Sequence, residues 1–230
     1  FILDYDDMHR VEADEEYFPK HCIKNEEVKQ SNGTIIKLCD IFNKKEIDLN
    51  KLIIGLVKRC KMFDENFKVV LIKNVNDMKA DEILLDSNMY LKSISDINKL
   101  QFTWNIPDDL TKLEINDDTV DYFIQNEIIG KIHTAMTPLK KDDQGIILYA
   151  NGKLCQDNCT FNDRANDNFF QYMSGSFDVD FIDSSFDVDN CSTDRKSLAW
   201  DIDENEELYK LQELLKKLVS IAQRKWREQR

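Results

Sequence analysis

Apolar and polar residues follow a helical period in the first part of the chain, flanked by two runs of β-branched and apolar residues. The helical pattern starts after Asp48, a common helix N-cap, and predicts a helix that runs to Cys60. The flanking runs are 33–39, which follows the Asn32-Gly33 turn signal, and 67–72, and they predict a strand on each side, the second one buried. The expected buried face of the helix consists of Leu49, Leu52, Ile53, Leu56, Val57 and Cys60.

The pattern changes to that of strands from Val120 onward. The runs 120–124, 127–136, 145–150 and 153–155 are expected to be strands, and Asn151-Gly152 between the last two predicts a hairpin with a type I′ turn. The segment 175–182 alternates apolar and polar residues, which is typical of a half-exposed strand.

A long amphipathic helix is predicted from about residue 205 to residue 228. Its apolar face is wider than a coiled-coil seam, so we expect the helix to pack on its own sheet. The stripe consists of Leu208, Leu211, Leu215, Leu218 and Ala222, widened by Leu214, Val219, Ile221 and Trp226.

A charged, asparagine-rich passage separates the two patterned regions. It extends from Asn74 to about Asp118 and contains the break Asn105-Ile106-Pro107. The sequence therefore predicts three parts: 1–75, a linker or partly helical connection over 76–118, and 119–230. The expected fold class is α+β, with a strand-helix-strand unit followed by a mixed β-sheet domain that ends in a long helix.

Composition narrows the class of protein. The chain has 230 residues, of which 42% are hydrophobic, enough to bury a core, so disorder throughout is excluded. Its formal net charge of −13 makes direct nucleic-acid binding unlikely.

No apolar run is long enough to span a membrane and no secretion signal is present, which predicts a cytoplasmic protein. The chain starts at Phe1 without a methionine, so we expect it to be a fragment.

Cysteines and carboxylates offer little support for a metal site. The six cysteines are expected to be reduced, and neither the Cys155 and Cys159 pair nor His21-Cys22 has the paired spacing of a structural zinc site. The aspartate cluster fits neither register of a calcium loop and is expected to be solvent-facing; a nuclease-type metal site there is a minor alternative. The cluster comprises Asp178, Asp180, Asp183, Asp187 and Asp189.

Two further groups of polar residues have simple structural interpretations. His133 lies in a strand pattern and is interpreted as a surface or hydrogen-bonded structural residue rather than as a catalyst. The segment 193–200, which ends in Trp200, is interpreted as a capping turn in which Arg195 pairs with a nearby aspartate.

Segments in a shared order resemble a known superfamily over about four-fifths of the chain. Gly33 to Leu38, the Asp48 helix and the Phe67 strand resemble the end of the ATP-binding domain of GHKL proteins, which include gyrase B, MutL, heat-shock chaperones, histidine kinases and the MORC-like branch. The second half resembles the transducer-type domain that follows it. The matching pieces there are TPLKK (137–141), GIILYANGKL (145–154), GSFDVDFID (175–183), STDRKSLAW (192–200) and the closing helix with Trp226.

The resemblance implies roles for four residues. Gly33 and Thr34 match the Gly-Thr strand of the adenine-binding network, although Thr34 also fits an ordinary strand position. Lys140 or Lys141 matches the lysine that reaches the γ-phosphate of ATP, a task suited to a compact charge. The motifs that bind the phosphates and magnesium are missing from this sequence. The resemblance thus implies an intact parent that binds ATP with magnesium through an upstream ATPase domain, and a segment that is inactive alone.

Two functions follow as expectations. The first is a transducer that couples the nucleotide state of the parent to a conformational change or to dimerisation. The second is a non-enzymatic interaction module, which could form a homodimer through the 208–226 helix. Deletion of 204–230 discriminates between a helix that packs on its own sheet and one that binds a partner.

Overall fold

The fold is described over most of the chain after residue 46. The computed structural model describes Arg10, Ile36 and residues 47–61, 63, 66–73, 81–161, 167–184, 190–200 and 206–230. The chain divides into two compact units, 1–46 and 47–230, and the elements below belong to the second. Apart from Ile36, the strand predicted at 33–39 lies outside the described residues, and so do Gly33 and Thr34.

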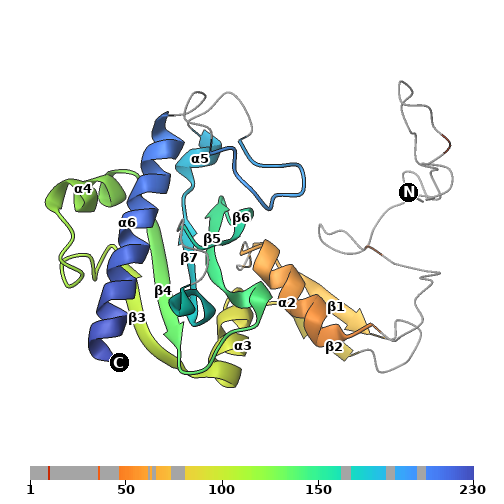
Figure 1. Cartoon of the computed structure of the whole chain (residues 1–230). Helices are drawn as coiled ribbons and strands as arrows, with labels where there is room; N and C mark the ends of the chain where they lie inside the picture. Colours follow the sequence, from red (N-terminus) through yellow and green to blue (C-terminus); the bar gives the residue numbers. More distant parts are fainter. Residues whose placement is uncertain are drawn as a thin grey trace. The chain divides into compact units, whose positions relative to one another are not determined.

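The described residues form an α+β fold around a mixed five-strand sheet (Figure 1). The spatial order is β3 (Leu100–Ile106), β4 (Ile129–Ala135), β7 (Met173–Asp178), β5 (Gly145–Ala150) and β6 (Lys153–Cys159). Only β5 and β7 run parallel, since the other neighbours in this sheet are antiparallel. The mixed sheet agrees with the predicted fold class.

The helix α6 (Glu206–Gln229) packs along one face of this sheet (Figure 1). The five residues predicted to form its apolar stripe are all fully buried, which confirms that the helix packs on its own sheet. At its end Trp226 contacts Phe169 in the short 3₁₀ helix η2 (Asn168–Gln171), with ring centroids 5.4 Å apart. Among the described residues, no helix has both the length and the apolar character needed to cross a membrane.

The first predicted helix is confirmed as α2 (Leu49–Arg59), with Asp48 as its N-cap. The Asp48 carboxylate accepts a hydrogen bond from the Lys51 backbone N–H at 3.1 Å. Within its predicted face, Ile53 and Val57 are buried, whereas Leu52 is exposed because α2 covers only a small sheet.

That small sheet consists of β1 (Val70–Lys73) and β2 (Asp81–Leu84), which are antiparallel. The strand predicted over 67–72 is present as β1, but the prediction that it is buried is wrong. Leu71 and Ile83 pack toward α2, but the side chains that alternate with them face outward, since nothing described covers the second face. Val70, Ile72 and Leu84 are between 43% and 53% exposed.

Two further elements differ from the prediction. The run 120–124 is part of helix α4 (Asp117–Gln125), not a strand, because its buried residues Thr119, Tyr122 and Phe123 follow the helical period. The passage 76–118 contains α3 (Met89–Asn98) and also β3, which is paired with β4 along its length.

The β5–β6 hairpin is confirmed. Asn151 and Gly152 have φ values of 48° and 69°, the positive values that a type I′ turn requires. The predicted strand 175–182 ends at Asp178, and Phe181–Ser184 form the short helix α5. Because β7 lies between β4 and β5, most of its side chains are buried rather than half exposed.

Candidate functional site

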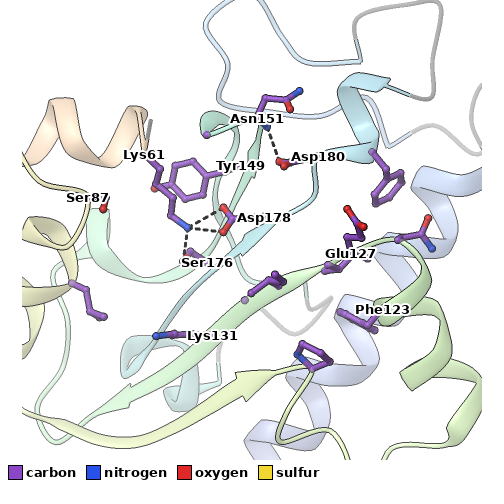
Figure 2. A pocket seen from close by; sticks show the side chains of 18 of the residues that line it. Lys61, Ser87, Phe123, Glu127, Lys131, Tyr149, Asn151, Ser176, Asp178 and Asp180 are labelled. Carbon is purple, nitrogen blue, oxygen red and sulfur yellow. Dashed lines mark hydrogen bonds and ion pairs between the residues drawn. The ribbon is translucent and has the colours of Figure 1, made fainter. Parts of the chain in front are cut away.

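A groove of about 1130 Å³ lies where α2 and α3 meet the face of the large sheet opposite α6 (Figure 2). The end of α2, the start of α3, the α4–β4 connection, β4, β7 and the hairpin turn all contribute to its lining. Its polar lining includes Lys61, Lys131, Asn151, Ser176, Asp178 and Asp180.

Lys61 is the central cation of this groove. It follows α2, and its ammonium lies 3.0 Å from the Asp178 carboxylate and 3.4 Å from the Ser176 hydroxyl, both on β7. The ammonium also lies over the Tyr149 ring, 4.3 Å from its centroid. The Lys61 backbone N–H donates to the Gly152 carbonyl at 2.7 Å. These contacts hold the end of α2 against the sheet.

Tyr149 connects the groove to α2. Its hydroxyl donates to the backbone carbonyl of Lys58 at 2.8 Å. Burial raises the pKa of Tyr149, and the nearby Asp178 carboxylate adds to this effect, so the residue remains a neutral phenol. A neutral phenol keeps the proton that this hydrogen bond needs.

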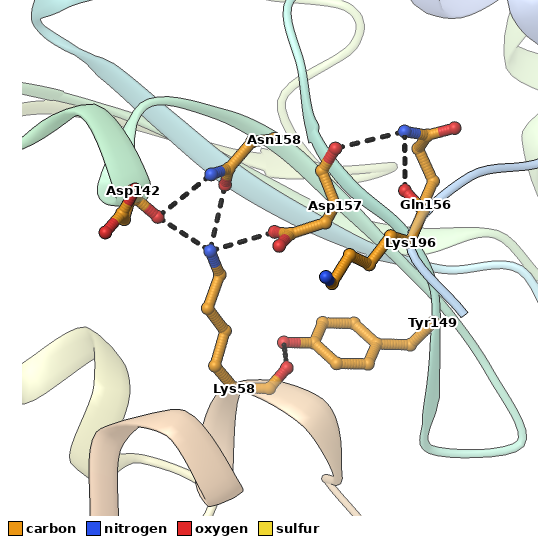
Figure 3. Close-up of polar contacts among 7 residues, drawn as sticks. All are labelled: Lys58, Asp142, Tyr149, Gln156, Asp157, Asn158 and Lys196. Carbon is orange, nitrogen blue, oxygen red and sulfur yellow. Dashed lines mark hydrogen bonds and ion pairs between the residues drawn. The ribbon is translucent and has the colours of Figure 1, made fainter. Parts of the chain in front are cut away.

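Lys58 makes a second set of contacts between α2 and the sheet (Figure 3). Its ammonium donates to the Asp142 carbonyl at 2.6 Å and to the Asn158 side-chain oxygen at 3.0 Å. It also pairs with the Asp157 carboxylate at 2.8 Å, and both side chains are largely shielded from solvent. Lys58 therefore has two hydrogen-bond acceptors and one ion-pair partner. Lys58 thus links α2 to β6 and to the 3₁₀ helix η1 (Lys141–Asp143).

Tyr90 on α3 joins the apolar parts of this region. It packs against three separate clusters, around Val57 of α2, Ala135 of β4 and Leu154 of β6. It also lies beneath the Lys58 ammonium, which is 5.8 Å from its ring centroid. The helix pair α2 and α3 is therefore fixed to the sheet by both apolar and polar contacts.

Lys140 and Lys141 lie on the connection between β4 and β5, as predicted from the sequence. Both are exposed, and no ion pair involving either is found among the described residues. Lys141 begins η1, so the Asp142 carbonyl that accepts from Lys58 is in the next residue. The structure thus brings the two lysines next to the Lys58 contacts, but not into the lining of the groove.

The aspartate cluster is divided among structural contacts. Asp178 pairs with Lys61, and Asp180 accepts a hydrogen bond from the Asn151 backbone N–H at 2.7 Å. Asp183 is exposed, and Asp187 and Asp189 lie outside the described residues.

His133 is buried, with its Nδ1 2.9 Å from the Thr103 hydroxyl on β3. This agrees with the interpretation of a hydrogen-bonded structural histidine. Burial lowers the pKa of His133 to about 4, so the ring is neutral at physiological pH.

The segment 193–200 is held on β6 by Gln156. The Gln156 side-chain oxygen accepts from the Leu198 backbone N–H at 3.1 Å and from the Trp200 indole at 3.0 Å. Its amide donates to the Lys196 carbonyl at 3.2 Å (Figure 3). Arg195 extends to Cys155, with a guanidinium nitrogen 4.0 Å from the sulfur. The Gln156 contacts agree with the interpretation of a structural turn, whereas the pairing of Arg195 with an aspartate stays a prediction.

Comparison with known proteins adds no family to this description. A scan against protein-family models gave no match, and a search of curated proteins found no significant match.

Sequence reasoning missed Lys58 and Lys61 as the residues that join the two patterned regions. Lys58 is 84 residues from Asp142 and 100 from Asn158, so no local spacing reports these contacts. The only available signal was the position of both lysines at the basic C-terminal end of a predicted helix, of whose expected apolar face Ile53 and Val57 are buried.

Proposed function

We propose that this chain is the transducer segment of a GHKL-type ATPase, coupling the nucleotide state of an ATP-binding domain to a conformational change or to dimerisation. The proposal rests on the ordered resemblance of segments described above. The observation that carries it is the contact of Lys58 with the loop that bears Lys140 and Lys141.

This contact provides a mechanical link. The α2 helix belongs to the part that resembles the ATP-binding domain, and η1 belongs to the part that resembles the transducer. Because Lys58 has oxygen partners in η1 and in β6, a displacement of α2 changes the position of η1 or breaks a shielded ion pair. The exposed ammonium groups of Lys140 and Lys141 lie on that loop, and they suit contact with a polyphosphate.

In this proposal ATP and magnesium belong to the intact parent, whose ATP-binding domain is the partner of this segment. Lys61, Ser176 and Asp178 of the groove contact one another, which favours a contact surface over a catalytic one there. We also propose a cytoplasmic location, which is the expectation from the sequence.

The first test compares lysine variants of the parent that carries the ATP-binding domain. ATP-analogue binding and ATP turnover are measured for the unchanged protein, for Lys140→Ala and for Lys141→Ala, with the exposed α3 variant Lys92→Ala as control. We expect one loop variant to lose at least about tenfold in turnover while still binding nucleotide, as for a removed transition-state contact. Lys92→Ala should match the unchanged protein.

A second variant tests the link itself. Lys58→Met in the parent keeps an unbranched side chain of similar length but removes the ammonium that contacts η1. We expect nucleotide binding to be retained and turnover to fall by about tenfold, a coupling of order 1 kcal/mol. If the parent binds no nucleotide at all, the proposal of a GHKL-type ATPase is wrong. A non-enzymatic protein interaction module is then the better description of this chain.

A further inference from the structure

Three potential metal ligands from distant parts of the sequence meet beside the β5–β6 hairpin. They are Cys155 on β6, Asp183 on α5 and Cys191, which forms an isolated bridge with Leu198. One ligand atom from each residue lies within 4.8 Å of the other two. The two cysteines are buried and are not in disulfides, whereas the aspartate is exposed.

The donor set is that of zinc. Zinc binds thiolates at about 2.3 Å and carboxylates at about 2.1 Å, so two sulfurs on one tetrahedral ion lie about 3.8 Å apart. The spacing of the three ligand atoms is compatible with this value after small side-chain rotations. Magnesium and calcium prefer all-oxygen sites, and two sulfurs out of three donors disfavour them.

The carboxylate is oriented by the hairpin turn. The Asn151 side-chain amide donates to Asp183 at 3.2 Å, and the Asn151 backbone N–H donates to Asp180 at 2.7 Å. Outer hydrogen bonds of this kind are usual for the carboxylate ligands of metal sites, because they fix the ligand before the ion arrives.

Charge balance also favours a divalent cation. The Arg195 guanidinium lies 4.0 Å from the Cys155 sulfur. With zinc bound, both cysteines would be thiolates, and together with the Asp183 carboxylate and this guanidinium they would carry a net charge of minus two around the ion. A single zinc ion cancels that charge.

We propose that Cys155, Asp183 and Cys191 form a zinc site with three protein ligands and solvent in the fourth position. The ion would connect β6, α5 and the 191–198 turn, and the exposed side of Asp183 provides its entry path. This site differs from the pair Cys155 and Cys159, which the sequence analysis considered as zinc ligands. Here Cys191 rather than Cys159 supplies the second sulfur. It is independent of the proposed coupling to ATP.

The test uses cobalt(II) as a spectroscopic substitute for zinc in the 230-residue chain. The protein is stripped of metal, kept reduced with a phosphine and titrated with cobalt(II), and zinc is then added. We expect one equivalent of cobalt(II) to give tetrahedral visible bands and a thiolate charge-transfer band, both abolished by one equivalent of zinc.

Matched variants assign the ligands. Cys155→Ser and Cys191→Ser should each remove most of the charge-transfer band, whereas Cys159→Ser on the same strand should retain it. Asp183→Asn changes an exposed side chain without changing its size, so it tests the site even where a cysteine variant fails to fold. We expect it to weaken zinc binding at least about tenfold.

Two results would overturn the proposal. One is a reduced, folded chain that binds no cobalt(II) with thiolate bands. The other is binding that persists unchanged in Asp183→Asn and in whichever cysteine variants fold.

Discussion

Gly130 on β4 lies against a fully buried aromatic ring. A Cβ at this position would lie 2.2 Å from a ring carbon of Phe177 on the neighbouring strand β7. Gly55 on α2 is the opposite case, because a Cβ there would meet no atom within 4 Å.

These two glycines predict opposite effects of the same substitution. Gly130→Ala should destabilise the protein by about 2 kcal/mol or more, since the buried ring has no room to move. Gly55→Ala should leave it unchanged or stabilise it by up to about 1 kcal/mol, because alanine is the better helix former. Urea unfolding of both variants measures the difference, and equal midpoints would contradict the packing described for Phe177.

His133 predicts a pH dependence of stability. Its pKa is about 4 in the folded protein and near the ordinary 6.5 when unfolded, so the unfolded state binds more protons between these values. The contribution of the neutral ring is complete above pH 6.5 and falls by up to about 3 kcal/mol as the pH drops toward 4. The free energy of unfolding, measured against pH, should fall less steeply in His133→Gln. Parallel curves would exclude the buried, neutral ring.

Single residues were predictable from the sequence where their role is local. Asp48 as an N-cap and Asn151-Gly152 as a type I′ turn depend on neighbouring atoms only, and both are confirmed. The contacts of Lys58 and Lys61 depend on how segments far apart in the sequence pack together. The local pattern of apolar and polar residues does not predict such packing.

At the scale of elements, the contacts of Lys58 predict how strongly α2 is attached to the large sheet. Lys58→Met removes an ammonium with three oxygen partners, one of them a shielded carboxylate, and should cost about 1 to 3 kcal/mol. Lys51→Met on the same helix removes an exposed pair with Asp48 and should cost at most about 1 kcal/mol. Chemical denaturation of both variants checks this. Similar losses would mean that the Lys58 contacts contribute little to attachment.

Two elements show why sequence patterns misled. The run Val120 to Ile124 is short and mostly apolar, which favours a strand, but Asn116 followed by two aspartates is a helix start signal that outweighs it. In β3 the alternation of Phe102, Trp104 and Ile106 was a valid strand signal. It was overlooked because the surrounding passage is charged.

At the scale of the whole molecule, α6 completes the main core. Its buried side chains belong to the same cluster as the inner face of the sheet. Deletion of 206–230 would expose that face, so we expect a product without a cooperative unfolding transition. Circular dichroism with thermal melting, together with sedimentation, measures this. A folded monomer would show instead that α6 is available to a partner.

The order of the strands was not predictable from the sequence. Each strand of the second half is a local pattern, but nothing in 173–178 indicates that this strand lies between two earlier ones. The candidate groove and the cysteine cluster both depend on that order, because β7 carries Asp178 and the chain that follows it carries Asp183.

The insertion of β7 has a consequence during synthesis on the ribosome. The β3–β4 pair and the β5–β6 hairpin emerge first, and each keeps an open edge until residues 173–178 leave the exit tunnel. The sheet therefore becomes continuous only when β7 pairs between β4 and β5, and α6 can cover it only after residues 206–229 have been synthesised. Between the synthesis of β6 and that of β7, a nascent chain of this protein therefore exposes the unpaired edges of β4 and β5, which are open to wrong strand pairing during that interval.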